Sequence, residues 1–302
     1  MPATPPSRSL ASRLWRRVRP GPRHALGATV SGDADPATLD GAEPFAFRCN
    51  VCGGPARATL ASLDREMPSC PHCGSNVRFR AIADLVVREL TGSRAALPDL
   101  ARRRDVVGIG LSDAACYAGP LARVFDYRNT FFHTSPRLDI TAIDAGLAGR
   151  HDFVIASDVF EHVAPPVGRA FDNALALLKP GGTFVMTVPF TLEPATREHF
   201  PDLHDWSLDE REGRWRLVNR TADRRIEVYE DLVFHGGPGT TLEMRVFARD
   251  ALLREFTRAG FASVRVADEP CLPFGIHWPH RWSLPIVAKA PSGNAGEALS
   301  NV

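Results

Sequence analysis

The stretch Asp152-Phe-Val-Ile-Ala-Ser-Asp158-Val-Phe-Glu161-His162-Val163 decides the fold of this chain. It begins with a short apolar run, typical of a buried strand, and polar residues follow directly. A helical pattern opened by prolines covers residues 165–178, and Lys179-Pro-Gly-Gly182 ends it before a second apolar run at 183–189. A strand, a helix and a second buried strand in this order predict one parallel βαβ unit.

The same alternation continues on both sides of this unit. Apolar runs predict strands over 105–110, 129–133, 261–266 and 282–288. Apolar stripes of helical spacing predict helices over 81–90, 114–125 and 249–259. Residues 81–290 are therefore expected to form one Rossmann-like α/β domain, a mostly parallel sheet with helices on both faces. Sheets of this kind bind their ligands at the carboxyl ends of the strands.

Two pairs of cysteines precede this domain, in Cys49-Asn-Val-Cys52 and Cys70-Pro-His-Cys73. Two Cys-x-x-Cys pairs at such a spacing supply the four thiolates of a tetrahedral Zn²⁺ site. A shell closed by four thiolates leaves no position for a substrate, so we predict a structural zinc in a small zinc-ribbon-like module over residues 45–80. Two disulfides are the alternative, and the first residues do not resemble the secretory signal that would favour them.

Composition restricts the partners of the chain. A net charge of +1 on 302 residues argues against a protein that coats nucleic acid. We find no apolar run long enough to span a membrane and expect a cytoplasmic protein. Residues 1–44 and 291–302 are expected to be disordered tails. A basic segment with an apolar face, built from Leu10, Leu14, Trp15 and Val18, leaves contact with an anionic membrane surface as a less favoured alternative.

The opening stretch, the helix after it and the run Leu-Lys-Pro-Gly-Gly-Thr-Phe resemble a class I S-adenosylmethionine (SAM)-dependent methyltransferase. The strand that starts near Phe261, entered from Ala-Gly-Phe, resembles the last hairpin of that fold, so the likeness covers roughly residues 100–290. The double Cys-x-x-Cys is similar to that of bacterial methyltransferases with a zinc module. The resemblance implies an enzyme that uses SAM.

The resemblance also implies where SAM binds. Gly108 and Gly110 end the first strand, and by position Asp139 resembles the residue that contacts the adenine. Asp158 ends the strand that borders the methyl-transfer centre, where it is expected to serve both cofactor and catalysis. The chain departs from the family at Gly108, where an acidic residue is usual, and it has no acid after the second strand to bind the ribose.

Candidate catalytic groups are carboxylates and histidines. Glu161 and His162 follow Asp158 within a turn, and His199 and His235 lie in histidine-rich stretches of the long segment after the fifth strand. A general base is needed when an oxygen or nitrogen nucleophile must lose a proton, and the sequence does not choose among these histidines and His133. A metal site made from His199, His204 and Asp202 is a further alternative.

Three hypotheses about function follow. The favoured one is methylation of a small molecule or glycan-type metabolite. The second is methylation of RNA or DNA that is bound by the zinc module. The arginines in and after this module favour the second hypothesis, whereas the near-neutral net charge of the chain opposes it. The third is a methyltransferase-like scaffold without activity, which the degenerate glycine motif after the first strand would allow.

Overall fold

The protein is described here from a computed structural model that covers residues 43–237 and 239–293. All of these belong to one unit of the chain, which begins at Asp33. The basic segment and most of the two predicted tails lie outside the described residues. No helix in the described part of the chain is long and apolar enough to cross a membrane.

The centre of the structure is a six-stranded sheet. Its strands are β3 (Arg103–Leu111), β4 (Phe125–Thr130), β5 (His151–Ser157), β6 (Leu178–Thr187), β15 (Ser263–Val266) and β16 (Ile286–Lys289). They lie in the order β15-β16-β6-β5-β3-β4, and β4, β3, β5 and β6 run parallel while β16 is antiparallel to both of its neighbours. The predicted mostly parallel sheet is confirmed. The chain leaves β3 toward β4 and returns on the other side as β5, so the strand order reverses between β3 and β5.

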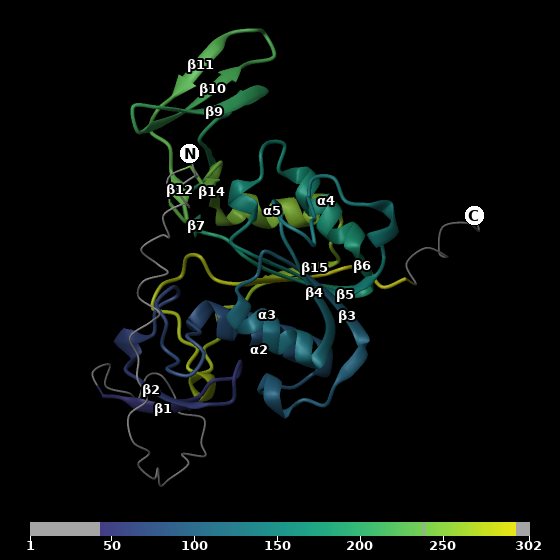
Figure 1. Ribbon diagram of the computed structural model, residues 1–302. Coiled ribbons are helices and arrows are strands. Elements are labelled where there is room, and N and C mark those ends of the chain that lie inside the picture. The colour runs from purple at the N-terminus through teal and green to yellow at the C-terminus, as the bar shows by residue number, and fades with distance from the viewer. Residues whose placement is uncertain (1–42, 238, 294–302) are drawn as a thin grey trace, which may run out of the picture. The chain divides into compact units, whose positions relative to one another are not determined.

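Helices cover both faces of this sheet (Figure 1). On one face lie α2 (Val77–Thr91) and α3 (Ala115–Val124), and on the other lie α4 (Gly168–Leu177) and α5 (Arg249–Ala259). The strand β5 shows why both faces need a covering layer, because successive side chains of a strand point to opposite faces of the sheet. Val154 and Ala156 pack in the core with α4 and α5, whereas Phe153 and Ile155 pack in the core with α2 and α3.

Several predicted boundaries are wrong. The second strand is Phe125–Thr130 and not 129–133, because Phe125 and Tyr127 alternate into the core as soon as α3 ends. The last strand is Ile286–Lys289, shorter than predicted. The turn Lys179-Pro-Gly-Gly182 does end the preceding helix, but it already belongs to β6, since Leu178 pairs with His151. The helix predicted over 81–90 begins at Val77, where Asn76 accepts a hydrogen bond from the Phe79 N–H as its N-cap.

The cysteine-rich segment shares its core with the large domain. It contains one hairpin, β1 (Phe45–Arg48) with β2 (Pro55–Ala58), and two cysteine-bearing turns. Cys49, Val51 and Cys70 pack in the same buried cluster as residues of α2, α3 and β5. Phe47 packs with Cys271 and Ile276, which come from the end of the chain. Part of this segment therefore packs into the same core as the sheet and helices of the large domain.

The segment between β6 and α5 is built from short strands. Its strands are β7 (Phe190–Thr191), β8 (Arg197–Glu198), β9 (Asp205–Arg211), β10 (Arg214–Arg220), β11 (Ile226–Tyr229), β12 (Phe234–His235), β13 (Thr241–Leu242) and β14 (Arg245–Ala248). The strands β9, β10 and β11 form an antiparallel meander that stands apart from the central sheet in Figure 1. The pair β12–β13 and the strand β14 lead the chain back to the sheet.

Candidate functional site

The four predicted zinc ligands lie together. The sulfurs of Cys49 and Cys73 are 3.7 Å apart, as are those of Cys52 and Cys70, and all four lie within 4.8 Å of one another. Four sulfurs at about 2.3 Å from one ion in a tetrahedron are about 3.8 Å apart. All described cysteines are free thiols, so the alternative of disulfides is not realised. The residues fit a zinc ion.

A buried arginine accompanies the thiolates. Arg80 of α2 has no exposed surface, and its guanidinium donates hydrogen bonds of 2.8 Å to the carbonyl oxygens of Ser75 and Gly275. Burial lowers the pKa of Arg80, and the nearby thiolates oppose this by favouring its charged form. Zn²⁺ with four thiolates carries a net negative charge, which one buried cation partly offsets. From the sequence, Arg80 counts only among the arginines that would favour nucleic-acid binding, not as a partner of the thiolates.

The carboxyl end of β5 carries an ion-pair network. Asp158 directly follows β5 with a φ of 54°, and its carboxylate accepts hydrogen bonds from Arg65 at 2.7 and 3.0 Å and from Thr187 Oγ1 at 2.9 Å. A second guanidinium, that of Arg78, lies 3.1 Å away. Burial raises the pKa of Asp158, but the two arginines outweigh it and hold the pKa below its ordinary value. Asp158 is therefore ionised and firmly oriented.

Next to Asp158 lies a group of five side chains that we call the histidine cluster: Glu161, His162, His199, His235 and Glu243. Glu161 and His162 form a short 3-10 helix after β5 (η5, Phe160–His162). Glu243 joins the other two histidines, because its carboxylate lies 2.7 Å from His199 Nε2 and 3.1 Å from His235 Nε2. Three segments far apart in sequence thus meet beside β5.

The protein environment controls two of these groups. Burial, followed by the charge of Asp158, raises the pKa of Glu161 well above its ordinary value. Burial also lowers the pKa of His162, which keeps this imidazole neutral near pH 7. A neutral imidazole is the form that accepts a proton, so His162 has the protonation state of a general base.

The structure brings most of the predicted catalytic residues together. Asp158, Glu161, His162, His199 and His235 all lie beside the end of β5. His133 and His204 are exposed elsewhere, and Asp202 pairs with Arg225, so the alternative metal site of His199, His204 and Asp202 is not assembled. Arg65 and Glu243 were missed as functional groups; the density of charged residues around His235 was the signal for Glu243.

The two glycines of β3 are close-packed against other side chains. A Cβ atom on Gly108 would lie 2.0 Å from the ring of Phe153, and one on Gly110 would lie 1.9 Å from the Tyr127 hydroxyl and 2.0 Å from Asp113. Asp113 is buried and accepts hydrogen bonds from Tyr117 and Tyr127. Burial raises the pKa of Asp113 to about 7. In this structure, packing alone requires both glycines.

The groups at the end of β4 make local contacts. The side chain of Asn129 accepts from the Asp113 N–H at 2.9 Å and donates to the Asp113 carbonyl at 2.8 Å, which fixes the turn after β3. Asp139 accepts from the backbone and hydroxyl of Thr141 at 2.9 and 2.7 Å. The carboxyl end of β4 therefore carries no acidic side chain that could bind a ribose, as its sequence already shows. Asp139 is half-buried in a polar turn.

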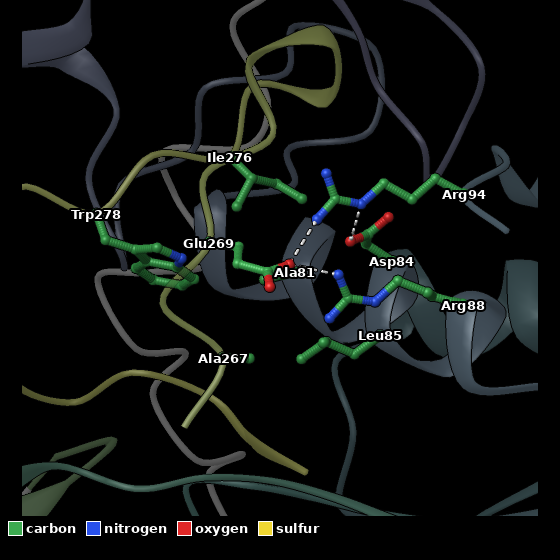
Figure 2. A pocket seen from close by; sticks show the side chains of 9 residues that line it. All are labelled: Ala81, Asp84, Leu85, Arg88, Arg94, Ala267, Glu269, Ile276 and Trp278. Atoms are coloured by element: carbon green, nitrogen blue, oxygen red, sulfur yellow. Dashed lines mark hydrogen bonds and ion pairs between the residues drawn. The ribbon is translucent and has the colours of Figure 1, made fainter. Parts of the chain in front are cut away.

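A small, partly open cavity lies elsewhere, between α2 and the segment after β15. Figure 2 shows Arg94 reaching both Asp84 and Glu269 at its edge, while Arg88 also contacts Glu269. Its volume is about 10 Å³, which is room for about one water molecule and not for a cofactor. We interpret it as a packing defect stabilised by ion pairs.

The strand order reverses between β3 and β5, and charged groups lie at the carboxyl end of β5, which is the place where parallel α/β sheets commonly bind their ligands. A family model described as a methyltransferase domain matches residues 79–266. The chain belongs to this methyltransferase family. The match confirms the resemblance to class I methyltransferases, the fold class and the prediction of an enzyme.

Solved structures of methyltransferases are similar to the chain at low identity. A 1,6-didemethyltoxoflavin-N1-methyltransferase from Burkholderia thailandensis is 14% identical with a TM-score of 0.41, over 71% of this chain and 78% of its own. The sugar N-methyltransferase KedS8 from a Streptoalloteichus species is 14% identical with a TM-score of 0.40, over 69% and 85%. DesVI from Streptomyces venezuelae is 16% identical with a TM-score of 0.38, over 71% and 90%. No curated protein matches the chain.

Proposed function

We propose that the protein transfers a methyl group from SAM to an oxygen or nitrogen atom of a small-molecule or glycan-type acceptor. The observation that carries this proposal is the position of Asp158 and the histidine cluster, at the carboxyl end of a central strand and beside the reversal of strand order. Ligands of parallel sheets bind at this place. The near-neutral charge of the chain favours a small acceptor over a nucleic acid.

Two arginines lie at the proposed cofactor site. Arg65 and Arg78 pair with Asp158 at the end of β5, and Arg78 also bonds to Ser157 and Glu66, so their guanidinium groups orient Asp158 at this site. Gly108, Gly110, Asp139 and Asp158 remain the cofactor-binding residues that we propose. When bound, SAM supplies an activated methyl group. The ribose must be held without the usual acid, since Asn129 is engaged with the backbone of Asp113.

The histidine cluster is suited to remove a proton from the acceptor. Methyl transfer requires mainly that the nucleophile be aligned with the methyl group, and a base adds to this when an O–H or N–H must be deprotonated. His162 is neutral and partly buried, and Glu243 holds His199 by a hydrogen bond and His235 by an ion-pair contact of 3.1 Å. We therefore propose His162 as the first choice of base and the other two as acceptor-binding groups.

The zinc ion is proposed to be structural. The four thiolates would fill all four coordination positions of the ion. Because Cys49 and Cys70 share a core with α2 and α3, the ion would also stabilise these helices. A cytoplasmic location stays a prediction from the sequence. So does the weaker possibility that the basic N-terminal segment touches a membrane surface.

The test is a transfer assay with SAM labelled in its methyl group. Label is to be sought on small sugars and metabolite fractions and, in parallel, on RNA and DNA. We expect label on a small molecule, lost in His162→Asn and kept in His204→Ala, which changes an exposed histidine of the same segment. Label on RNA alone would support the nucleic-acid hypothesis, and SAM binding without any transfer would support the scaffold.

A further inference from the structure

Besides the four cysteines, one other group of metal-binding side chains comes together in the described part of the chain. It consists of Glu161, His162 and His235, whose candidate ligand atoms lie within 4.8 Å of one another. Glu161 and His162 follow β5 in sequence, whereas His235 comes from the β12–β13 hairpin. Two distant segments thus place three potential ligands around one point.

The carboxylate of Glu161 has no partner of its own. The side chain is fully buried, and neither of its oxygens forms a hydrogen bond. Its Oε1 lies 3.8 Å from His162 Nε2. A buried carboxyl group that makes no hydrogen bond is costly whether or not it holds a proton, and in proteins such groups are paired or coordinate a metal. Glu161 therefore points to a cation beside His162.

The two imidazoles face each other through His162 Nε2 and His235 Nδ1, which are 3.2 Å apart. His162 Nδ1 lies 2.9 Å from the Leu242 carbonyl, to which only an N–H can donate, so in the neutral ring Nε2 carries the lone pair. His235 Nε2 lies 3.1 Å from the Glu243 carboxylate, so a neutral His235 that is protonated at Nε2 also has its lone pair on Nδ1. Either a proton on His235 Nδ1 or a shared metal ion joins the two nitrogens.

The spacing fits a metal ion. Two ligand atoms at about 2.0–2.2 Å from one ion are about 2.8–3.6 Å apart when they subtend a right or tetrahedral angle. The two imidazole nitrogens, 3.2 Å apart, lie in this range, and Glu161 Oε1, 3.8 Å from His162 Nε2, lies just outside it. The groups behind the ligands also match a metal site, because a ligating histidine usually donates its other N–H to a carbonyl or a carboxylate. Here Leu242 and Glu243 provide one of each.

We propose that Glu161, His162 and His235 bind one divalent transition-metal ion of the Mn²⁺ or Fe²⁺ type. Two imidazoles and one carboxylate on one side of an ion leave coordination positions open on the other. His235 is 40% exposed, so this open side is reachable by a ligand. Metal binding stands independently of the methyltransferase proposal. Its role rests on that proposal and replaces His162 as the free base, because the Nε2 lone pair would be occupied by the ion: an acceptor hydroxyl bound to the ion loses its proton to water more readily and is held in place for methylation.

The test uses the zinc-loaded protein titrated with Mn²⁺ alone, without SAM or acceptor. Electron paramagnetic resonance distinguishes free from bound Mn²⁺. We expect one bound ion per chain, with affinity at least 10–100-fold weaker in Glu161→Gln and in His235→Ala. His204→Ala should bind Mn²⁺ like the original protein. Glu161→Gln replaces an unpartnered buried carboxylate by an amide of the same shape, so it should fold, and its circular dichroism and zinc content check this.

Two results would overturn the proposal. One is a folded original protein that binds no Mn²⁺, which would mean that a proton rather than a metal joins the two imidazoles. The other is unchanged Mn²⁺ affinity in Glu161→Gln. Mn²⁺ binding that depends on Glu161, in a protein that transfers no methyl group to any acceptor, would support the metal site while removing the proposed function.

Discussion

Arg65 donates two hydrogen bonds to Asp158, at 2.7 and 3.0 Å, across 93 positions of the sequence. Arg65 lies between the two cysteine pairs, and Asp158 ends the strand beside the histidine cluster. The cysteine-rich segment therefore contributes directly to the candidate active site. This relationship connects the proposed structural zinc with the proposed chemistry.

Substitution of Arg65 by lysine should weaken both the fold and the site. Lysine keeps the charge but loses the paired geometry, and a buried charge with an impaired partner costs about 1–3 kcal/mol. We expect the free energy of unfolding to fall by this amount and SAM affinity to fall with it. Arg57→Lys is the matched control, because Arg57 of the same segment contacts only the Pro44 carbonyl through its side chain. Equal effects of the two substitutions in denaturant titrations would contradict the account.

Removal of zinc should destabilise the whole domain. Cys49 and Cys70 share a buried cluster with α2, α3 and β5, so loss of the metal exposes a core that belongs to the sheet. A structural zinc supplies about 10–16 kcal/mol of apparent binding energy in small modules. We expect one bound zinc by elemental analysis and a large decrease in melting temperature after chelation or in Cys70→Ser. Cys116→Ser, which changes a cysteine outside the site, should keep both the zinc and the melting temperature.

Two glycines allow a matched test of close packing. In Gly110→Ala the new Cβ would lie 1.9 Å from the Tyr127 hydroxyl, so we expect a loss of about 1–3 kcal/mol or more. In Gly119→Ala no atom lies within 4 Å of the new Cβ, and the residue is inside α3. Alanine is there expected to stabilise the protein by about 0.5–1 kcal/mol. Unfolding in urea measures the free energy of unfolding of both variants. If both substitutions changed it by a similar amount in the same direction, the result would be inconsistent with this packing.

Asp113 should make stability depend on pH. Its pKa is about 7 in the folded protein against an ordinary value of 3.8, so the folded state holds the proton more tightly. The stabilisation is present below about pH 4 and is lost as the pH rises through 7, and the difference of about three pH units corresponds to about 4 kcal/mol. In Asp113→Asn this loss should disappear. Unfolding measured from pH 4 to 8 tests it, with Asp126→Asn on the exposed side of β4 as control.

The sequence predicts those parts of the fold that local patterns encode. The apolar run of β5 and the stripe of α5 are found where the patterns place them, because a buried strand and an amphipathic helix need only short-range periodicity. The start of β4 was wrong because Phe125-Asp126-Tyr127 continues directly from α3 without a break in the sequence. The strands β7, β8, β12 and β13 have two residues each, too few for any periodicity to be detected.

The candidate site was predictable in its local part only. Asp158, Glu161 and His162 stand in one motif, so a strand end with acidic and imidazole groups was visible from the sequence. The contacts of Asp158 with Arg65 and of His199 with Glu243 depend on how distant segments fold back. No spacing in the sequence encodes such contacts, and only the three-dimensional structure reveals them.

The most direct measurement is a calorimetric titration of the zinc-loaded protein with SAM, in parallel with Asp139→Ala and Asp158→Asn. A hydrogen bond to a charged group is worth about 1.5–3 kcal/mol, so we expect micromolar binding by the original protein and more than tenfold weaker binding by each variant. That result would place SAM at the carboxyl ends of β3, β4 and β5. A folded protein that binds no SAM would contradict the account.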